Sequence, residues 1–343
     1  MRAALIREFG PVEDLTVETM ADPVVSPGHV VVDVHATAVN FVDLLVITGK
    51  YQFLPPRPFT PGKLPCGVVI AVGPDVTTLR VGDRVMTLHE QGGYAEKVLV
   101  PAHECYVLPD SLSFVDAAAM SLAYDTAWFA LCERGRAKPG ESVLVLGATG
   151  GVGLAAIQLA RAYGLHVLAA VSSPGKTQQV RDAGAHGIVD LSQGTLIDSL
   201  REQVRAQTDG QGVDIVIDTL GGDVFDAALR GMAWRGRLVV VGFATGRIPT
   251  LKVNYVMLKN IEVSGLQVSD YRKRTPDDMA HCIREIFRLY EDGALRPAAV
   301  TQHPLEDVVL ALDALQSRRA SGRLVLTMNA DASAAPLSTR PGA

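Results

Sequence analysis

The first third of the chain alternates short apolar runs with glycine, proline and aspartate. Apolar runs occupy residues 30–36 and 68–73, and turn residues precede further strand-like segments at 81–85 and 92–96. Short strands with this punctuation are typical of compact β domains. The pattern therefore predicts a β-rich, barrel-like domain over residues 1–123.

From Tyr124 onward the pattern changes to continuous apolar runs that alternate with helical periodicity. The runs at 143–146, 213–218 and 238–242 carry few polar residues, as expected of parallel strands that are buried on both faces. Right-handed crossovers between such strands give a doubly wound sheet. We therefore predict an α/β Rossmann domain over residues 124–268.

The C-terminal part departs from this alternation. A helical pattern at 277–291 is followed by short elements that end in an apolar run at 322–326. We expect residues 269–328 to return to the first domain and to complete a substrate-binding, catalytic domain. The last segment, 329–343, is small, polar and contains proline, which predicts a disordered tail.

Composition narrows the classes of function. The chain has 343 residues, of which 48% are hydrophobic and 20% charged, and its formal net charge is −5. This charge provides no basic surface for nucleic acid, and no apolar run approaches the ~18 residues of a membrane span. The start, MRAALIREFG, has no signal-peptide pattern, and the four cysteines are far apart. We therefore expect a cytoplasmic protein without a disulfide framework.

Candidate chemistry begins where the apolar run at 143–146 ends. This run meets residues 148–153, ATGGVG, and a helical pattern follows at once. A strand, a glycine-rich turn and a helix together aim unpaired backbone N–H groups at a bound pyrophosphate. Ala148 replaces the usual first glycine, whereas Gly150 and Gly153 keep the close phosphate approach and the helix packing. The segment predicts dinucleotide binding.

The end of the next predicted strand, residues 166–171, favours NADPH over NADH. An NAD enzyme usually has an acidic residue there, about 20 residues after the glycines, that binds the ribose 2′-hydroxyl. This chain has Ser172, Ser173 and Lys176 instead, and two hydroxyls with an ammonium can bind a 2′-phosphate. The stretch also fits a helix start with Ser173 as N-cap and Pro174 after it. Both interpretations can hold together.

Ordered short motifs extend along nearly the whole chain. They are Asn40-Phe41-Val42-Asp43, Thr48-Gly49-Lys50-Tyr51, Pro61-Gly62, Val81-Gly82-Asp83-Arg84-Val85, Gly93-Tyr94-Ala95-Glu96, Tyr124-Asp125-Thr126-Ala127, the glycine-rich turn, and Ser317-Arg318 with Gly322. Over residues 1–328 the chain thereby resembles the zinc-free quinone oxidoreductases, the zeta-crystallin group of the medium-chain dehydrogenase/reductase superfamily. The resemblance implies a GroES-like barrel domain with a Rossmann domain, and an NADPH:quinone reductase or an enone or enoyl reductase.

The resemblance also implies which residues form the site. Asn40 and Tyr51 would be catalytic, and Asn40 would also contact the cofactor. The other implied cofactor contacts are Thr126 near the nicotinamide, Gly150, Gly151 and Val152 at the pyrophosphate, Ser172, Lys176 and Arg318 at the 2′-phosphate, and Gly242, Phe243 and Ala244 at the nicotinamide ribose. The structural alternatives are a turn cap for Asn40, packing for Tyr51 and a helix C-terminal cation for Arg318.

The same resemblance predicts no metal site. Zinc-dependent members of the superfamily carry cysteine at the position of Asn40, and Gly-His-Glu where this chain has Gly62-Lys63-Leu64. Their four-cysteine structural-zinc loop is also missing. The only local cluster that suggests metal ligands is His103-Glu104-Cys105, for which surface and strand roles are more ordinary. Leu45 and Leu64 replace a tyrosine and an acidic residue of many quinone reductases, so this wall of the cleft is less polar.

We expect hydride transfer from NADPH to a quinone or an α,β-unsaturated carbonyl compound. Hydride addition leaves negative charge on an oxygen, which needs a hydrogen-bond donor, and the Asn40 amide and the Tyr51 hydroxyl suit this role. Tyr51, a ribose hydroxyl and water are alternative sources of the final proton. Two other functions stay open. One is a zinc-free alcohol dehydrogenase, disfavoured because no strong base stands at a recognisable spacing, and the other is an NADPH-gated binding or structural protein.

The predicted sixth strand, residues 261–266, is the last strand of the α/β part and should form an edge of its sheet. An unpaired edge is a site for pairing with another chain, and members of the family commonly join there across a twofold axis. We therefore expect a homodimer that acts on a small molecule, with no nucleic acid or membrane partner.

Overall fold

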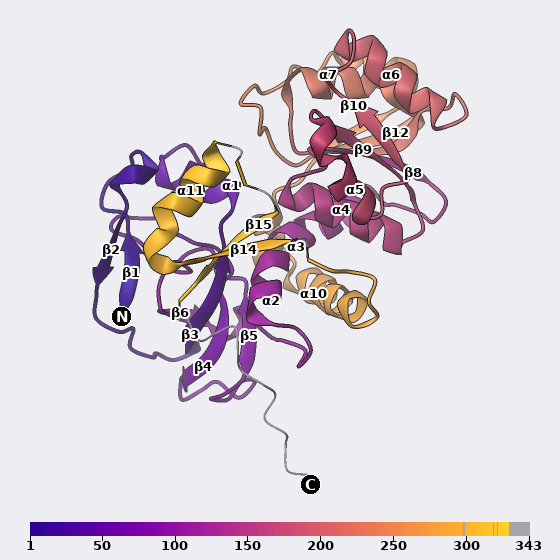
Figure 1. Ribbon diagram of the computed structural model, residues 1–343. Helices are drawn as coiled ribbons and strands as arrows, with labels where there is room; N and C mark the ends of the chain where they lie inside the picture. Colours follow the sequence, from indigo (N-terminus) through magenta and orange to yellow (C-terminus); the bar gives the residue numbers. More distant parts are fainter. Residues whose placement is uncertain (298, 318, 321, 329–343) are drawn as a thin grey trace. The chain divides into compact units, whose positions relative to one another are not determined.

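The computed structural model describes residues 1–297, 299–317, 319, 320 and 322–328, which form two compact units (Figure 1). Met1–Ser121 and the described residues from 297 onward form the first unit, and Leu122–Arg296 form the second. The predicted disordered tail lies outside the described residues. Among those residues, no helix combines the length and the apolar character needed to cross a membrane. The cytoplasmic location stays a prediction.

The first unit is built on a seven-stranded sheet of order β14-β15-β3-β4-β5-β7, and β6 also pairs with β3. These strands are β3 (His29–Ala38), β4 (Cys66–Val72), β5 (Arg84–Thr87), β6 (Lys97–Pro101), β7 (Cys105–Val107), β14 (Val300–Pro304) and β15 (Arg323–Thr327), and a separate pair is formed by β1 (Arg2–Leu5) and β2 (Thr16–Thr19). The pairings are antiparallel except that of β14 with β15. The sheet confirms the predicted β-rich domain.

The core of the first unit joins both ends of the chain. Buried valines of β3 pack with Leu324 and Leu326 of β15 and with Leu312, and each fully buried leucine contributes about 1.5–3 kcal/mol. The helices described in this unit are α1 (Phe41–Ile47), α2 (Phe114–Met120) and α11 (Val308–Gln316), with 3₁₀ turns η1 (Val12–Asp14), η2 (Ala102–Glu104) and η5 (Leu305–Asp307). Figure 1 shows the yellow C-terminal strands beside the N-terminal part of the chain.

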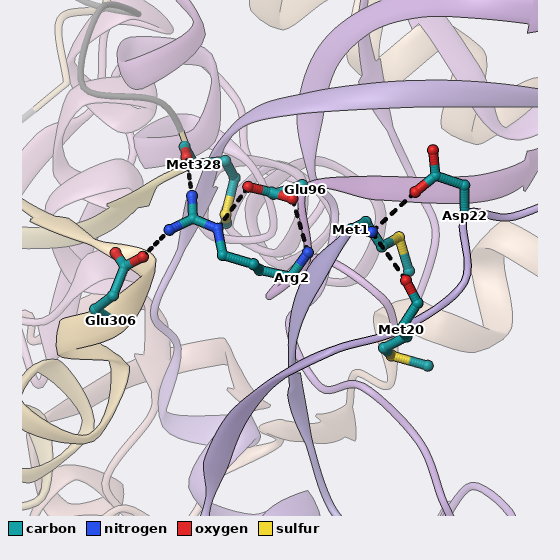
Figure 2. A network of polar contacts seen from close by, with 7 residues as sticks. All are labelled: Met1, Arg2, Met20, Asp22, Glu96, Glu306 and Met328. Carbon is teal, nitrogen blue, oxygen red and sulfur yellow. Dashed lines mark hydrogen bonds and ion pairs between the residues drawn. The ribbon is translucent and has the colours of Figure 1, made fainter.

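Arg2 connects the first strand to residues from the other end of the chain (Figure 2). Its Nε donates to Glu96 Oε1 at 2.7 Å, and its backbone N–H donates to Glu96 Oε2 at 2.7 Å. The same guanidinium forms an ion pair with Glu306 and donates to Met328 O at 3.4 Å. Exposed pairs of this kind contribute at most about 1 kcal/mol each. Their main effect is to fix where the C-terminal segment lies on the first unit.

The second unit contains a six-stranded sheet of order β10-β9-β8-β11-β12-β13. Its strands are β8 (Ser142–Leu146), β9 (His166–Val171), β10 (Gly187–Asp190), β11 (Val213–Asp218), β12 (Met232–Val240) and β13 (Glu262–Gly265), and all pairings are parallel. Residues 143–146 of β8 are fully buried, which explains their continuous apolar run. The strand order turns back at β8, and this topology confirms the predicted Rossmann fold.

Helices alternate with these strands along the chain. Four of them that pack on the sheet are α4 (Gly151–Ala162), α6 (Leu196–Ala206), α7 (Gly222–Gly231) and α8 (Val253–Lys259). The other helices described in the unit are α3 (Ala123–Trp128), the π-helix η3 (Phe129–Arg134), η4 (Pro174–Lys176), α5 (Thr177–Asp182), α9 (Val268–Arg274) and α10 (Pro276–Glu291). Because all strands of this sheet are parallel, each crossover between neighbouring strands returns the chain to the same end of the sheet.

The chain returns to the first unit later than the sequence analysis expected, at residue 297 instead of 269. Helices α9 and α10 belong to the second unit. Arg272 Nη2 donates to Asp125 Oδ2 at 2.6 Å, and these side chains are only 6% and 2% exposed. The ring of Tyr271 also packs on Phe129, with centroids 4.4 Å apart. Breaking a buried ion pair leaves an uncompensated charge, so these contacts hold α9 to α3 and to η3.

Candidate active site

The glycine-rich turn after β8 closes tightly around Gly147. Gly147 has φ +70°, and Gly150 donates its N–H to Gly147 O at 3.0 Å. A Cβ on Gly153 would lie 2.3 Å from Gly147 O and 2.8 Å from Ala148 Cα, so only glycine allows this helix to pack so closely. The residue in the left-handed conformation is Gly147. It lies one residue before Ala148, with which the sequence analysis began the glycine-rich turn.

The N-terminus of α4 provides unpaired N–H groups. The first turn contains no acidic residue, and its N-cap, Gly150, has no side chain that could accept a hydrogen bond. Leu154 N–H donates to Gly150 O, which leaves the N–H groups of Gly151, Val152 and Gly153 without an acceptor in the helix. These groups and the positive end of the helix dipole form an anion site. The structure thus brings Gly150, Gly151 and Val152 together, and their contact with a pyrophosphate stays a prediction.

The loops after β11 and β12 lie at the same edge of the sheet as this turn. Thr219 Oγ1 donates to Leu146 O at 3.0 Å, and Ala244 N–H donates to Thr219 O at 3.1 Å. Phe243 is 40% exposed. Because the strand order reverses at β8, this edge is the position at which open α/β sheets bind ligands. Gly242, Phe243 and Ala244 therefore share an edge with the glycine-rich turn.

Asp218 shapes the loop that follows β11. It is fully buried, and its Oδ1 accepts from Leu220 N–H at 2.8 Å and from Gly221 N–H at 2.9 Å. Burial raises the pKa of Asp218, and these two N–H groups oppose that rise. The Asp218 carboxylate therefore fixes the backbone of the loop after β11, which lies at the sheet edge described above.

The predicted 2′-phosphate residues lie on the surface after β9. Ser172 and Lys176 are exposed, and Lys176 N–H donates to Ser173 O at 3.1 Å, which closes a turn. No acidic residue occurs between β9 and the last residue of α5. An ammonium and hydroxyls without a competing carboxylate suit a phosphate group. Arg318, the third residue predicted here, lies outside the described residues.

Thr126 lies in α3 and is 7% exposed. Its Oγ1 donates to Leu122 O at 2.5 Å, and its backbone N–H donates to Asp125 Oδ1 at 2.5 Å. Leu122 has φ +56°, a conformation that non-glycine residues rarely adopt. Because the proton of the Thr126 hydroxyl is used inside the helix, Thr126 is suited to accept a hydrogen bond from a ligand.

On the first unit, Asn40 caps α1 with its backbone and keeps its amide for other partners. Its backbone N–H donates to Asp43 Oδ2 at 2.8 Å, and its carbonyl accepts from Asp43 N–H at 3.0 Å. The side-chain Nδ2 donates to Ala38 O at 3.1 Å, and Oδ1 accepts from Arg323 Nη2 at 2.8 Å. The residue is 5% exposed. The cap role and a catalytic role are therefore compatible.

Asp43 is the buried acid beneath Asn40. Its Oδ2 also accepts from the Tyr94 hydroxyl at 2.7 Å. Burial raises the pKa of Asp43 to about 6, while the Tyr94 and Asn40 hydrogen bonds and the charges of Lys63 and Arg323 lower it. Burial and the Asp43 charge hold the pKa of Tyr94 well above its ordinary value. At neutral pH Asp43 is therefore mostly ionised and Tyr94 stays a hydroxyl donor.

Two of the family motifs pack directly on each other. Tyr94 N–H donates to Pro61 O at 2.9 Å, and Gly93 N–H donates to Gly62 O at 2.9 Å. Gly62 has φ +93°, and a Cβ there would lie 2.4 Å from the Tyr94 ring. Glycine is required for this approach, which fixes the backbone next to Lys63.

Lys63 places a buried cation in this cluster. It is 5% exposed and forms an ion pair with Glu90. Its Nζ lies 5.5 Å from the centre of the Tyr51 ring, within cation–π range. Tyr51 packs against the core of the first unit and meets Phe53 edge-on, with centroids 6.2 Å apart. Since the charge of Lys63 also acts on Asp43, this lysine links Tyr51 to the Asp43 network.

The first unit therefore carries one polar cluster, and the second carries the predicted nucleotide-binding residues. Asn40 and Tyr51 belong to the polar cluster with Asp43, Lys63 and Arg323. The sequence analysis did not find Arg323, which stands 283 positions from the Asn40 that it binds. Only the pairing of β15 with β3 brings the two together, and no local pattern signals it.

The side chains at the positions where zinc-dependent members of the superfamily hold zinc do not suit a metal. Asn40 Oδ1 already accepts from a guanidinium, Lys63 presents an ammonium, and Leu64 is apolar and buried. Zinc needs converging thiolate, imidazole or carboxylate ligands. Among the described residues, no three His, Cys, Asp or Glu side chains form such a group, and Glu104 pairs with His89 at 2.7 Å. The site offers hydrogen-bond donors and cations instead.

Known proteins share this architecture. The family descriptions "Alcohol dehydrogenase GroES-like domain" and "Zinc-binding dehydrogenase" match residues 26–110 and 151–285. Quinone oxidoreductase-like protein 2 of Rattus norvegicus is 36% identical over 328 residues, which cover 95% of this chain and 92% of the relative. The solved quinone oxidoreductases of Pseudomonas syringae pv. Tomato DC3000 and of Escherichia coli, the latter complexed with NADPH, are 30% and 26% identical. Both have a TM-score of 0.88, and the matches cover 95% and 96% of this chain and 99% and 100% of theirs. The chain belongs to the quinone oxidoreductase branch of the medium-chain dehydrogenase/reductase superfamily.

Proposed function

We propose that this enzyme transfers a hydride from NADPH to a quinone or to an α,β-unsaturated carbonyl compound. The observation that carries the proposal is one edge of the sheet of the second unit. There an uncapped helix N-terminus follows β8 at the switch point, and a segment with Lys176 and no acidic residue follows the neighbouring strand β9. NADPH, when bound, supplies the hydride. A relative solved with NADPH supports this choice of cofactor.

The second unit would hold the phosphates of the cofactor. Gly150, Gly151 and Val152 would face the pyrophosphate, for which the free N–H groups of Gly151 and Val152 are suited, and Ser172 and Lys176 suit the 2′-phosphate. The loop at 242–244 would line the nicotinamide ribose, and Thr126 would accept a hydrogen bond near the nicotinamide. Arg318 remains part of the predicted 2′-phosphate contact.

The first unit would act on the substrate. As hydride adds to carbon, negative charge develops on the substrate oxygen, and donors held in place stabilise this charge more than they stabilise the ground state. The Asn40 amide and the Tyr51 hydroxyl are such donors. Lys63 adds positive potential next to Tyr51, partly screened by Glu90. We propose that this arrangement takes the place of a zinc ion.

We further propose that two copies join through the second unit. β13 is the last strand of its sheet, and α8 ends directly before it. No residue of α8 is buried, and Val253, Met257 and Leu258 are 73%, 70% and 68% exposed. An unpaired strand edge beside exposed apolar side chains is a site of association, and a second copy offers the same edge in return.

Steady-state oxidation of NADPH and NADH with a panel of quinones and enones tests the function. We expect turnover with NADPH and weaker use of NADH. Lys176→Glu should narrow or reverse this preference, because a carboxylate repels the 2′-phosphate. Lys138→Glu makes the same charge change before β8, at the opposite end of the sheet, and should leave the preference unchanged.

Each negative result of this experiment leads to a different conclusion about the cofactor or the function. Equal affinity for the two cofactors in the unmodified protein would contradict the choice of NADPH. Tight NADPH binding without oxidation by any acceptor would favour a binding protein. Oxidation of alcohols with NADP⁺, without reduction of quinones or enones, would favour an alcohol dehydrogenase.

A further inference from the structure

Arg323 reaches from the start of β15 to two helix ends. Its Nε donates to Ala119 O at 3.1 Å, in the last turn of α2, where the negative end of the helix dipole favours a cation. Its Nη2 donates to Asn40 Oδ1 at 2.8 Å, at the start of α1. Gly322 before it has φ +80°, and a Cβ there would lie 1.9 Å from Ala299 O. The backbone that carries Arg323 is therefore fixed.

These contacts determine which way the Asn40 amide faces. A guanidinium can only donate and a backbone carbonyl can only accept. Arg323 therefore holds Oδ1 on its own side, and Ala38 O holds Nδ2 on the other. One N–H of the amide remains, and no described residue accepts from it. A buried N–H without an acceptor is costly, which suits a group that receives a ligand oxygen.

We propose that Arg323 is a positioning residue, which locks the Asn40 amide with its remaining N–H available to the substrate oxygen. The inference rests on the proposed function, in which Asn40 donates to that oxygen. Without Arg323 the amide can turn over about its terminal torsion, which has roughly two-fold preferences. Oδ1 would then face the substrate oxygen and repel the charge that develops on it.

The lock also defines the substrate atom at this position. An amide N–H fixed as donor requires an acceptor, and the carbonyl oxygen of a quinone or an enone is only an acceptor. Charge on that oxygen grows during hydride addition, so loss of the lock should act on kcat more than on substrate KM.

The test is a double-mutant cycle on NADPH oxidation with Arg323→Met, Asn40→Ala and the double variant. We expect each single change to lower kcat by roughly 100- to 1000-fold, the range of a lost oxyanion donor. The double variant should match Asn40→Ala to within about twofold, because Arg323 has nothing left to position. Arg7→Met, which removes an exposed arginine paired with Glu18, is the matched control and should leave kcat unchanged.

Arg323→Lys separates charge from geometry. It keeps a cation near Asp43 but cannot bind Ala119 and Asn40 with one rigid fork, so kcat should stay low while the fold is retained. Losses that multiply in the double variant, or wild-type kcat in Arg323→Lys, would overturn the inference and leave the proposed function intact. Absence of turnover in the unmodified enzyme would overturn the proposed function, and the inference with it.

Discussion

At the scale of the residue, Tyr51 combines a packed ring with a hydroxyl that suits an oxygen-binding role. The ring meets Phe53 and lies under the ammonium of Lys63. Tyr51→Phe keeps these ring contacts and removes the hydroxyl. We expect turnover to fall ~10-fold to 1000-fold, because a hydrogen bond made in the transition state acts on kcat, with little change in melting temperature.

Tyr255→Phe is the control for this substitution. The Tyr255 hydroxyl bonds to Arg230 in the second unit, so its removal should not affect the chemical step. Unchanged turnover of Tyr51→Phe with several quinones and enones would remove Tyr51 from the catalytic group and leave Asn40 as the remaining donor.

Asp43 gives the protein a pH dependence whose sign follows from its burial. Its pKa of about 6 in the folded protein lies above the ordinary value of 3.8. The folded state therefore holds this proton more tightly than the unfolded chain does. The resulting stabilisation is complete below pH 3.8 and is lost as the pH rises through about 6.

Asp43→Asn removes this titration and keeps an oxygen that can accept from the Tyr94 hydroxyl. The free energy of unfolding of the variant, relative to wild type, should rise by up to roughly 3 kcal/mol between about pH 4 and about pH 7. Urea denaturation at each pH measures it. Asp110→Asn, at an exposed position, should show no such rise. A relative stability of Asp43→Asn that stays flat or falls would disprove the assignment.

At the scale of the element, the apolar runs located the buried strands well. The run at 213–218 coincides with β11, and the helical pattern at 277–291 lies within Pro276–Glu291. The first half of β12 was missed because Trp234 and Arg235 are exposed there, so that half lacks a continuous apolar run. A strand that is buried on both faces can be recognised in the sequence as a continuous apolar run. A strand with both exposed and buried residues lacks such a run.

The residues of the candidate site also differ in how far the sequence alone could identify them. A glycine-rich turn and a surface without acidic residues are local features, so Gly150 and Lys176 could be proposed as phosphate contacts from the sequence alone. Lys63 stands in the Gly62-Lys63-Leu64 segment, where zinc-dependent members of the superfamily carry Gly-His-Glu. This difference in the sequence already indicated a site without zinc. Arg323 and the partnership of Arg272 with Asp125 depend on tertiary contacts over 283 and 147 positions, which no local pattern contains.

The α8–β13 segment yields a prediction about association. Light scattering at micromolar concentration should give about twice the chain mass of 36.5 kDa. Met257→Glu with Leu258→Glu should give monomers, because two charges would be buried against the partner. Val24→Glu, at a valine of the first unit that is 82% exposed, should leave the dimer intact. A wild-type monomer, or a dimer that persists in the double variant, would rule out this interface.

At the scale of the whole molecule, the polar cluster predicts a response to metal removal. Lys63 and the guanidinium beside Asn40 repel a divalent cation, so dialysis against a strong chelator should leave kcat unchanged. Metal analysis of the purified protein checks the same point. Zinc bound in equal proportion to the chain, and lost together with turnover, would contradict the proposed metal-free reaction.

The placement of β15 has a consequence for the order in which the two units can fold during synthesis. β15 is the last strand described, yet it pairs with β3 inside the sheet of the first unit. A ribosome delivers the second unit as one continuous stretch, which can close its core while the first unit still lacks an inner strand. A transcript or a proteolytic fragment that ends before residue 322 would therefore yield a folded nucleotide-binding half joined to an unfinished catalytic half, in which Asn40 has lost its guanidinium partner.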